Sequence, residues 1–213
     1  MVFYSVVRGI VSGGVALLYR ARIRGKAHLP TRGGYVLAPS HRSMIDIPVA
    51  GWLTRRRLRY MGKQSLFDIP VLGWLFTVLG GFPVQRDGTD RKALRASIAM
   101  LRGGEVLLVY PEGTRQHGPK IEPLQPGAAY LALRAGVPIV PVGIAGTEEI
   151  FRSHRTKIPR FGRIAIVIGV PIEPPAARSS GLVPRAEVDA LTARLHDELQ
   201  RVFEEAYELR AGR

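Results

Sequence analysis

The chain has 213 residues, enough for one domain with a full core or at most two small ones, and 46% are hydrophobic, which excludes a disordered protein. It contains no cysteine, which excludes a disulfide scaffold, a thiolate zinc site and an acyl intermediate on a protein thiol. The formal net charge of +14 favours anionic partners such as nucleic acids, anionic lipid headgroups or phosphorylated substrates.

The first segment, residues 2–19, is mostly apolar but is interrupted by Arg8 and three glycines. A bilayer-spanning helix needs about 20 apolar residues, so this segment falls short. It also lacks the small-residue cleavage site of a secretory signal. Residues 1–21 are therefore predicted to form a helix that associates with a membrane face; the alternative is an ordinary first helix packed on the core.

Further along, segments typical of strands alternate with segments typical of helices, which predicts an α/β fold, a single domain with a mixed β-sheet flanked by helices. The strands are expected at 22–25, 34–38, 58–61, 80–86, 105–110, 136–142 and 163–169, and the helices at 45–54, 91–101, 126–135 and 186–209. The last helix follows a linker at 173–185 and carries an apolar stripe at three- and four-residue spacing that should pack on the sheet.

The segment 39–46 holds a histidine, His41, and an aspartate, Asp46, five positions apart. On one straight helix they would point about 140° apart, so His41 is predicted in a turn and Asp46 in the first turn of the next helix, capped by Ser40 or Ser43. A carboxylate on one imidazole nitrogen leaves the other as a general base near neutral pH. The simpler alternative is that His41 caps a helix and Asp46 occupies its favourable first turn.

No nucleophile of the protein's own accompanies His41, because the chain lacks cysteine and a G-x-S-x-G motif. The base would therefore activate a hydroxyl group on a substrate.

Two later segments place positive charge where a strand should end. Residues 80–86 are a glycine pair, a hydrophobic stretch and Arg86, whose planar guanidinium suits a phosphate. Residues 111–115 follow a buried strand with a glycine turn, to which Thr114 adds a hydrogen-bond donor and Arg115 a charge. They could form an anion-binding concavity or only a polar surface turn.

These segments, in this order, resemble the glycerolipid acyltransferases of the lysophosphatidate acyltransferase type, whose defining block is an H-x4-D. The matching blocks span residues 39–142, about half of the chain, and end with the apolar strand 136–142. Ser40 is a departure, since the family usually has asparagine there. The resemblance implies an acyltransferase domain at 22–213, with its motifs in a core at 35–145.

The resemblance also implies residue roles. His41, oriented by Asp46, would deprotonate an acceptor hydroxyl that attacks the acyl thioester of coenzyme A or acyl carrier protein. Glu112 would orient Arg86 or Arg115, or contact a substrate hydroxyl. The residues expected to hold the acceptor's phosphate are Lys63, Arg86, Glu112, Gly113, Thr114 and Arg115. Those expected to pack an acyl chain or shape the site floor are Val137, Pro138, Ile139 and Pro141. Neither a cofactor nor a metal is implied.

The predicted function is that of a 1-acylglycerol-3-phosphate acyltransferase that makes phosphatidate, placed at the cytoplasmic face of the cell membrane as a peripheral or monotopic protein. The alternatives are another acceptor, glycerol 3-phosphate or a different lysophospholipid, and a non-catalytic protein that binds anionic lipids. The basic run at 55–59 beside the apolar segment 69–79 suits an anionic membrane, although such runs are usually solvated faces. Nucleic acid is not an expected partner, because the basic clusters lack interleaved stacking aromatics.

Overall fold

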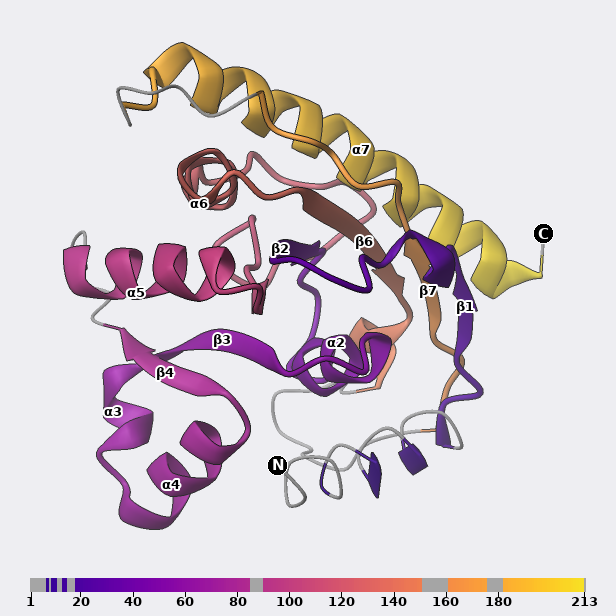
Figure 1. Cartoon of the computed structure of the whole chain (residues 1–213). Coiled ribbons are helices and arrows are strands. Elements are labelled where there is room, and N and C mark those ends of the chain that lie inside the picture. Colours follow the sequence, from indigo (N-terminus) through magenta and orange to yellow (C-terminus); the bar gives the residue numbers. More distant parts are fainter. Residues whose placement is uncertain are drawn as a thin grey trace.

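The computed structural model describes residues 7, 9–10, 13–14, 18–84, 90–150, 161–175 and 182–212. Within them, seven strands form one sheet in the order β1-β7-β6-β2-β5-β3-β4 (Figure 1). Strands β6, β2, β5, β3 and β4 run parallel, whereas β7 is antiparallel to β6, so the predicted mixed sheet is confirmed. The strands are β1 Arg22–Arg24, β2 Tyr35–Pro39, β3 Leu58–Lys63, β4 Gly81–Val84, β5 Val106–Leu108, β6 Ile139–Ala145 and β7 Ala165–Ile168.

Helices cover both faces of this sheet. In Figure 1, α5, α6 and α7 lie on one face and α2 on the other, while α3 and α4 sit beside β3 and β4 at one end of the sheet. The helices are α2 Asp46–Leu53, α3 Gln64–Phe67, α4 Pro70–Val78, α5 Arg91–Arg102, α6 Gly127–Ala135 and α7 Arg185–Ala211, with 3-10 turns at Lys26–His28 and Thr147–Glu149.

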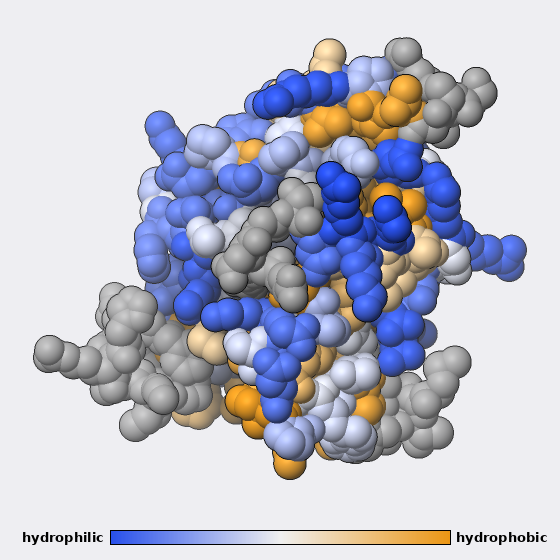
Figure 2. All heavy atoms as spheres, turned by 90° about the vertical axis from the view of Figure 1, so that its left-hand side faces the viewer, coloured by the Kyte–Doolittle hydropathy of each residue, from blue (hydrophilic) through white to orange (hydrophobic). Residues whose placement is uncertain are grey.

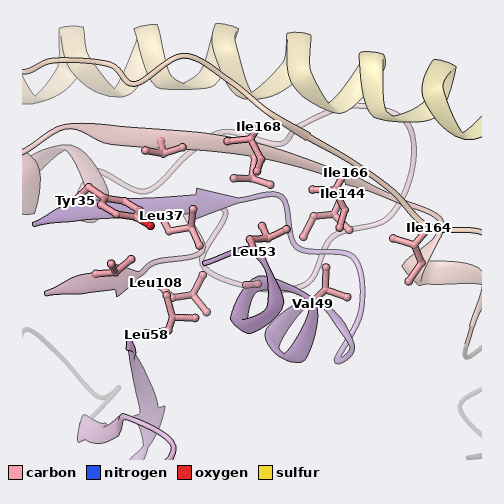
Figure 3. Packing of buried hydrophobic residues seen from close by; sticks show 14 of the residues in the cluster. Tyr35, Leu37, Val49, Leu53, Leu58, Leu108, Ile144, Ile164, Ile166 and Ile168 are labelled. Atoms are coloured by element: carbon pink, nitrogen blue, oxygen red, sulfur yellow. The ribbon is translucent and has the colours of Figure 1, made fainter. Parts of the chain in front are cut away.

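The core is divided by the sheet, because successive side chains of a strand point to opposite faces. On β2, Tyr35 and Leu37 pack with α2, whereas Val36 and Ala38 pack with α6 and the first half of α7. Figure 3 shows the first of these clusters, in which side chains of α2 meet those of β2, β6 and β7. The central strands are buried on both faces, so their carboxyl ends form a rigid support for the loops that follow them.

The last helix packs directly on β6, as its apolar stripe predicts. Gly143 of β6 makes this approach possible, since a Cβ atom there would lie 2.1 Å from the carbonyl oxygen of Val202 on α7. Any side chain at position 143 would push α7 off the sheet.

The bounds of one strand differ from the expected ones for a local reason. Strand β6 runs from Ile139 to Ala145 and not over 136–142, because Gly136 ends α6 in a left-handed conformation (φ 69°) and the strand begins only after the turn that follows. Residues 143–145, which lie beyond the expected strand, pair with β7.

The predicted N-terminal helix falls mostly outside the described residues, and within those residues no helix is long and apolar enough to cross a bilayer.

Candidate active site

Four segments with candidate functions meet at one edge of the sheet. His41 follows β2, Lys63 ends β3, the turn at 111–115 follows β5, and Thr147 follows β6. These four strands are parallel, so their carboxyl ends lie together. Ligands of open α/β sheets commonly bind at this edge.

The predicted pair of His41 and Asp46 is formed. The Nδ1 atom of His41 lies 3.0 Å from Oδ2 of Asp46, and that oxygen also accepts the backbone N–H groups of Arg42 (2.6 Å) and Ser43 (2.7 Å). The other carboxylate oxygen accepts the hydroxyl of Thr147 (2.6 Å). Asp46 is fully buried and acts as an acceptor in all four bonds, so it favours the tautomer with the proton on Nδ1 and leaves Nε2 for a substrate.

The serines near His41 do not cap helix α2, so that prediction is wrong. Helix α2 begins at Asp46 with Ile45 as its N-cap and no side-chain cap bond. The hydroxyl of Ser40 instead accepts the backbone N–H of Ile144 on β6 (3.0 Å). Ser43 gives its own N–H to Asp46, because the loop folds back over the carboxylate.

The ring of Tyr110, two positions after the end of β5, stacks on the imidazole of His41. Its hydroxyl is buried and has no hydrogen-bond partner among the described residues. Burial, with the charge of Asp46 as a smaller cause, raises the pKa of Tyr110 well above the ordinary value of a phenol. The phenol is therefore neutral at neutral pH.

A buried ion pair joins the loops after β2 and β5. The guanidinium of Arg42 donates to the carboxylate of Glu112 (2.8 Å) and to the carbonyl of Lys120 (2.8 Å), and lies over the ring of Phe203 on α7. Glu112 also accepts the backbone N–H of His41 (2.9 Å). Both side chains are almost completely buried, so the structure places Glu112 under the His41 loop and not on the exposed surface.

The rest of the turn after β5 faces solvent. Gly113 adopts a positive φ of 74°, which favours glycine, and Thr114 and Arg115 beside it are exposed. The backbone N–H of Gln116 donates to the carbonyl of His41 (2.9 Å), so this turn is tied directly to the loop that carries His41.

Lys63 is also exposed at this edge, opposite Val84 in the register of β3 and β4. Arg86 lies outside the described residues, so its predicted role stays a prediction. The described part of β4 ends at Val84, two positions before it.

The four residues predicted to form the site floor lie within the first half of β6 or in the two positions before it. Val137 and Ile139 are buried in the cluster between the sheet and helices α6 and α7, on the opposite face from α2. Pro141 is also buried and pairs with Ala38 of β2. A contact of these residues with an acyl chain stays a prediction.

Three residues of this arrangement were not identified from the sequence. The sequence predicts for Tyr110 only a place in a strand, and Arg42 carries no motif of its own. Thr147 had a usable signal, since Gly146 and Thr147 follow a buried strand that is parallel to β2. Among the described residues, no group of three or more His, Cys, Asp or Glu side chains could hold a metal ion.

Comparison with known proteins finds a matching family model and similar enzymes. Residues 20–145 match the family model described as Acyltransferase. The 1-acyl-sn-glycerol-3-phosphate acyltransferase of Bacillus subtilis is 25% identical over 85% of this chain and 87% of its own length. The corresponding alpha enzyme of Mus musculus is 25% identical over 87% of this chain and 64% of its own length.

The fold is also known from a solved structure. The 1-acyl-sn-glycerophosphate acyltransferase PlsC of Thermotoga maritima superposes with a TM-score of 0.75 at 24% identity, covering 95% of this chain and 80% of that one. At this identity the structural match shows the fold alone. The family model covers more than half of the chain. The chain therefore belongs to the acyltransferase family, as the resemblance of its four blocks indicated.

Proposed function

We propose that this acyltransferase transfers a fatty acyl group from the thioester of acyl-coenzyme A or acyl carrier protein to the free hydroxyl of lysophosphatidate, giving phosphatidate. The observation that carries the proposal is the bond between His41 Nδ1 and Asp46, at the edge of the sheet where exposed Lys63 and Arg115 also lie. The acceptor is suggested by the names of relatives that match most of the chain.

In the proposed reaction, Nε2 of His41 takes the proton of the acceptor hydroxyl as the oxygen attacks the thioester carbonyl. The resulting imidazolium is stabilised by Asp46. When the tetrahedral intermediate collapses, the carbon–sulfur bond breaks and the imidazolium returns the proton to the leaving thiolate. The cycle therefore ends with an ester, a free thiol and a neutral histidine.

The acceptor's phosphate is proposed to bind the basic edge of the site, formed by Lys63, Arg86 and the turn with Gly113, Thr114 and Arg115. Arginine suits this task because its planar fork can donate two hydrogen bonds to one phosphate. Because acceptor and product are lipids, we place the reaction at the cytoplasmic face of the cell membrane.

The test is release of free thiol from palmitoyl- or oleoyl-coenzyme A by the purified protein, with lysophosphatidate, with glycerol 3-phosphate and without acceptor. We expect release that requires lysophosphatidate and that falls by about 10²–10⁴-fold in His41→Ala, the usual cost of losing a general base. His196→Ala is the control, because it removes an imidazole on α7 that contacts the carbonyl of Ile121 (3.1 Å) and not Asp46.

Two results would contradict the proposal. Release that requires glycerol 3-phosphate would reassign the acceptor. Absence of release with every acceptor, from both coenzyme A and carrier-protein thioesters, would favour a non-catalytic protein that binds anionic lipids.

A further inference from the structure

Helix α4 presents an apolar face to solvent. None of its residues, Pro70–Val78, is charged, and Val71 and Trp74 are 79% and 58% exposed on neighbouring turns. Ile69, directly before the helix, is 51% exposed. In Figure 2, which looks onto the side that carries α3 and α4, hydrophobic residues lie among hydrophilic ones over the lower part, and a second hydrophobic group lies near the top.

A surface helix normally carries charged residues on its outer face. Helix α5 follows this rule, since Arg91, Lys92 and Arg95 are exposed along it. The adjacent exposed apolar residues on α4 therefore indicate a surface that contacts a partner.

Basic residues lie at both ends of this apolar face. Lys63 is exposed directly before α3, and the guanidinium of Arg57 donates to the carbonyl of Val78 at the end of α4 (3.4 Å). Asp68, between the two helices, is acidic, and its carboxylate accepts the side-chain amide of Gln64 (2.9 Å). The charge around the apolar face is thus positive on balance.

We propose that α3 and α4 dock on an anionic phospholipid bilayer, with Val71 and Trp74 entering the interface. Tryptophan suits the boundary between headgroups and acyl chains because its ring is apolar and its N–H is polar. Basic side chains around the apolar face are attracted to anionic headgroups. An apolar helix face with a basic border fits this partner on both counts.

The docking deepens the proposed function by naming its membrane-contacting surface. Lys63 ends β3 and directly precedes α3, so a bilayer in contact with α3 and α4 brings the headgroup layer to the edge of the sheet where His41 lies. A lysophospholipid could then offer its phosphate to the site without leaving the bilayer completely.

Tryptophan fluorescence tests the contact directly, because the chain has only two tryptophans. In Trp52→Phe, Trp74 is the single reporter. Vesicles of equal phosphatidylcholine and phosphatidylglycerol, with bromine on the upper acyl chain, should shift its emission to the blue and quench it. The matched control is Trp74→Phe, whose remaining reporter, Trp52, packs against the core and should not be quenched.

A second experiment measures binding by co-sedimentation with the same vesicles. It uses two single variants of the protein that keep both tryptophans. Val71→Asp places a negative charge on the docking face and should weaken binding about tenfold. Val170→Asp is the control, because Val170 is also exposed (59%) but follows β7, which is antiparallel to the strands that carry the site. Its binding should equal that of the unmodified protein.

Failure of the protein to bind these vesicles would overturn the proposal, and so would binding that leaves Trp74 unquenched or that Val71→Asp does not weaken. A blue shift that rises with protein concentration in the absence of lipid, together with a dimer in sedimentation equilibrium, would assign the face to a second copy of the chain. None of these measurements requires turnover, so failure of docking and failure of acyl transfer are separate results.

Discussion

The imidazole of His41 lies against the ring of Tyr110, with the ring centroids 3.9 Å apart and the planes inclined by 22°. Asp46 holds the imidazole by one edge, and Tyr110 supports one of its faces. When His41 accepts a proton, the cation forms over the electron-rich face of the phenol. Such contacts contribute about 0.5–1 kcal/mol when exposed and about 2 kcal/mol when desolvated.

Tyr110→Leu should therefore lower kcat about five- to thirtyfold, the range that about 1–2 kcal/mol corresponds to, with little effect on the KM of the acceptor. Tyr110→Phe keeps the stacking and should keep kcat within about twofold. Because the lost hydroxyl is buried without a partner among the described residues, Tyr110→Phe should also match or raise the thermal midpoint. An equal loss of kcat in both variants would show that the hydroxyl, and not the ring, is required.

Thr147 supports Asp46 from β6, at a position that is completely buried. Thr147→Val keeps the shape of the side chain but leaves one carboxylate oxygen without its donor, so unfolding in urea should show a loss of about 1–3 kcal/mol. The turnover number should fall as well, because the carboxylate that orients His41 is less firmly held. Thr147→Ser retains the hydroxyl and should restore most of both; a stable, fully active Thr147→Val would contradict this role.

Much of this molecule could be predicted from its sequence, because the signals are local. Alternating apolar strands and helices indicated the α/β sheet, and the five-residue step from His41 to Asp46 required a turn between them. The bond between those two side chains followed from that geometry, and the structure contains it.

What could not be predicted depends on contacts between distant segments. Nothing local marks Arg42 as a buried residue, because its partner Glu112 lies seventy positions later in the chain. Glu112 itself was expected among exposed cations, and only the folding of the loop after β5 under the loop after β2 buries it. Ser40 was expected to cap a helix, but a neighbouring strand supplies a better donor from Ile144.

The pair of Arg42 and Glu112 should contribute to stability more than to acceptor binding. Its side chains are 1% and 0% exposed, so removing one partner leaves a buried charge without compensation, at a cost of about 3–5 kcal/mol. Glu112→Gln and Arg42→Met should each lower the midpoint of urea unfolding. The double variant should recover part of the loss, because two neutral side chains leave no isolated charge. A raised KM for the acceptor at unchanged stability would instead place Glu112 in contact with the substrate.

The exposed cations Lys63 and Arg115 should act on the acceptor's phosphate and not on the chemical step. Lys63→Ala and Arg115→Ala should each raise the KM for lysophosphatidate about tenfold or more with a smaller change in kcat, because a lost hydrogen bond to a charged group costs about 1.5–3 kcal/mol. Turnover of a monoacylglycerol, which lacks the phosphate, should be equally slow in both variants and in the unmodified enzyme. Arg194→Ala, an exposed arginine on α7, controls for loss of charge alone. If all three variants raise the KM equally, general attraction between a basic protein and an anionic lipid explains the effect, and neither residue is part of a phosphate site.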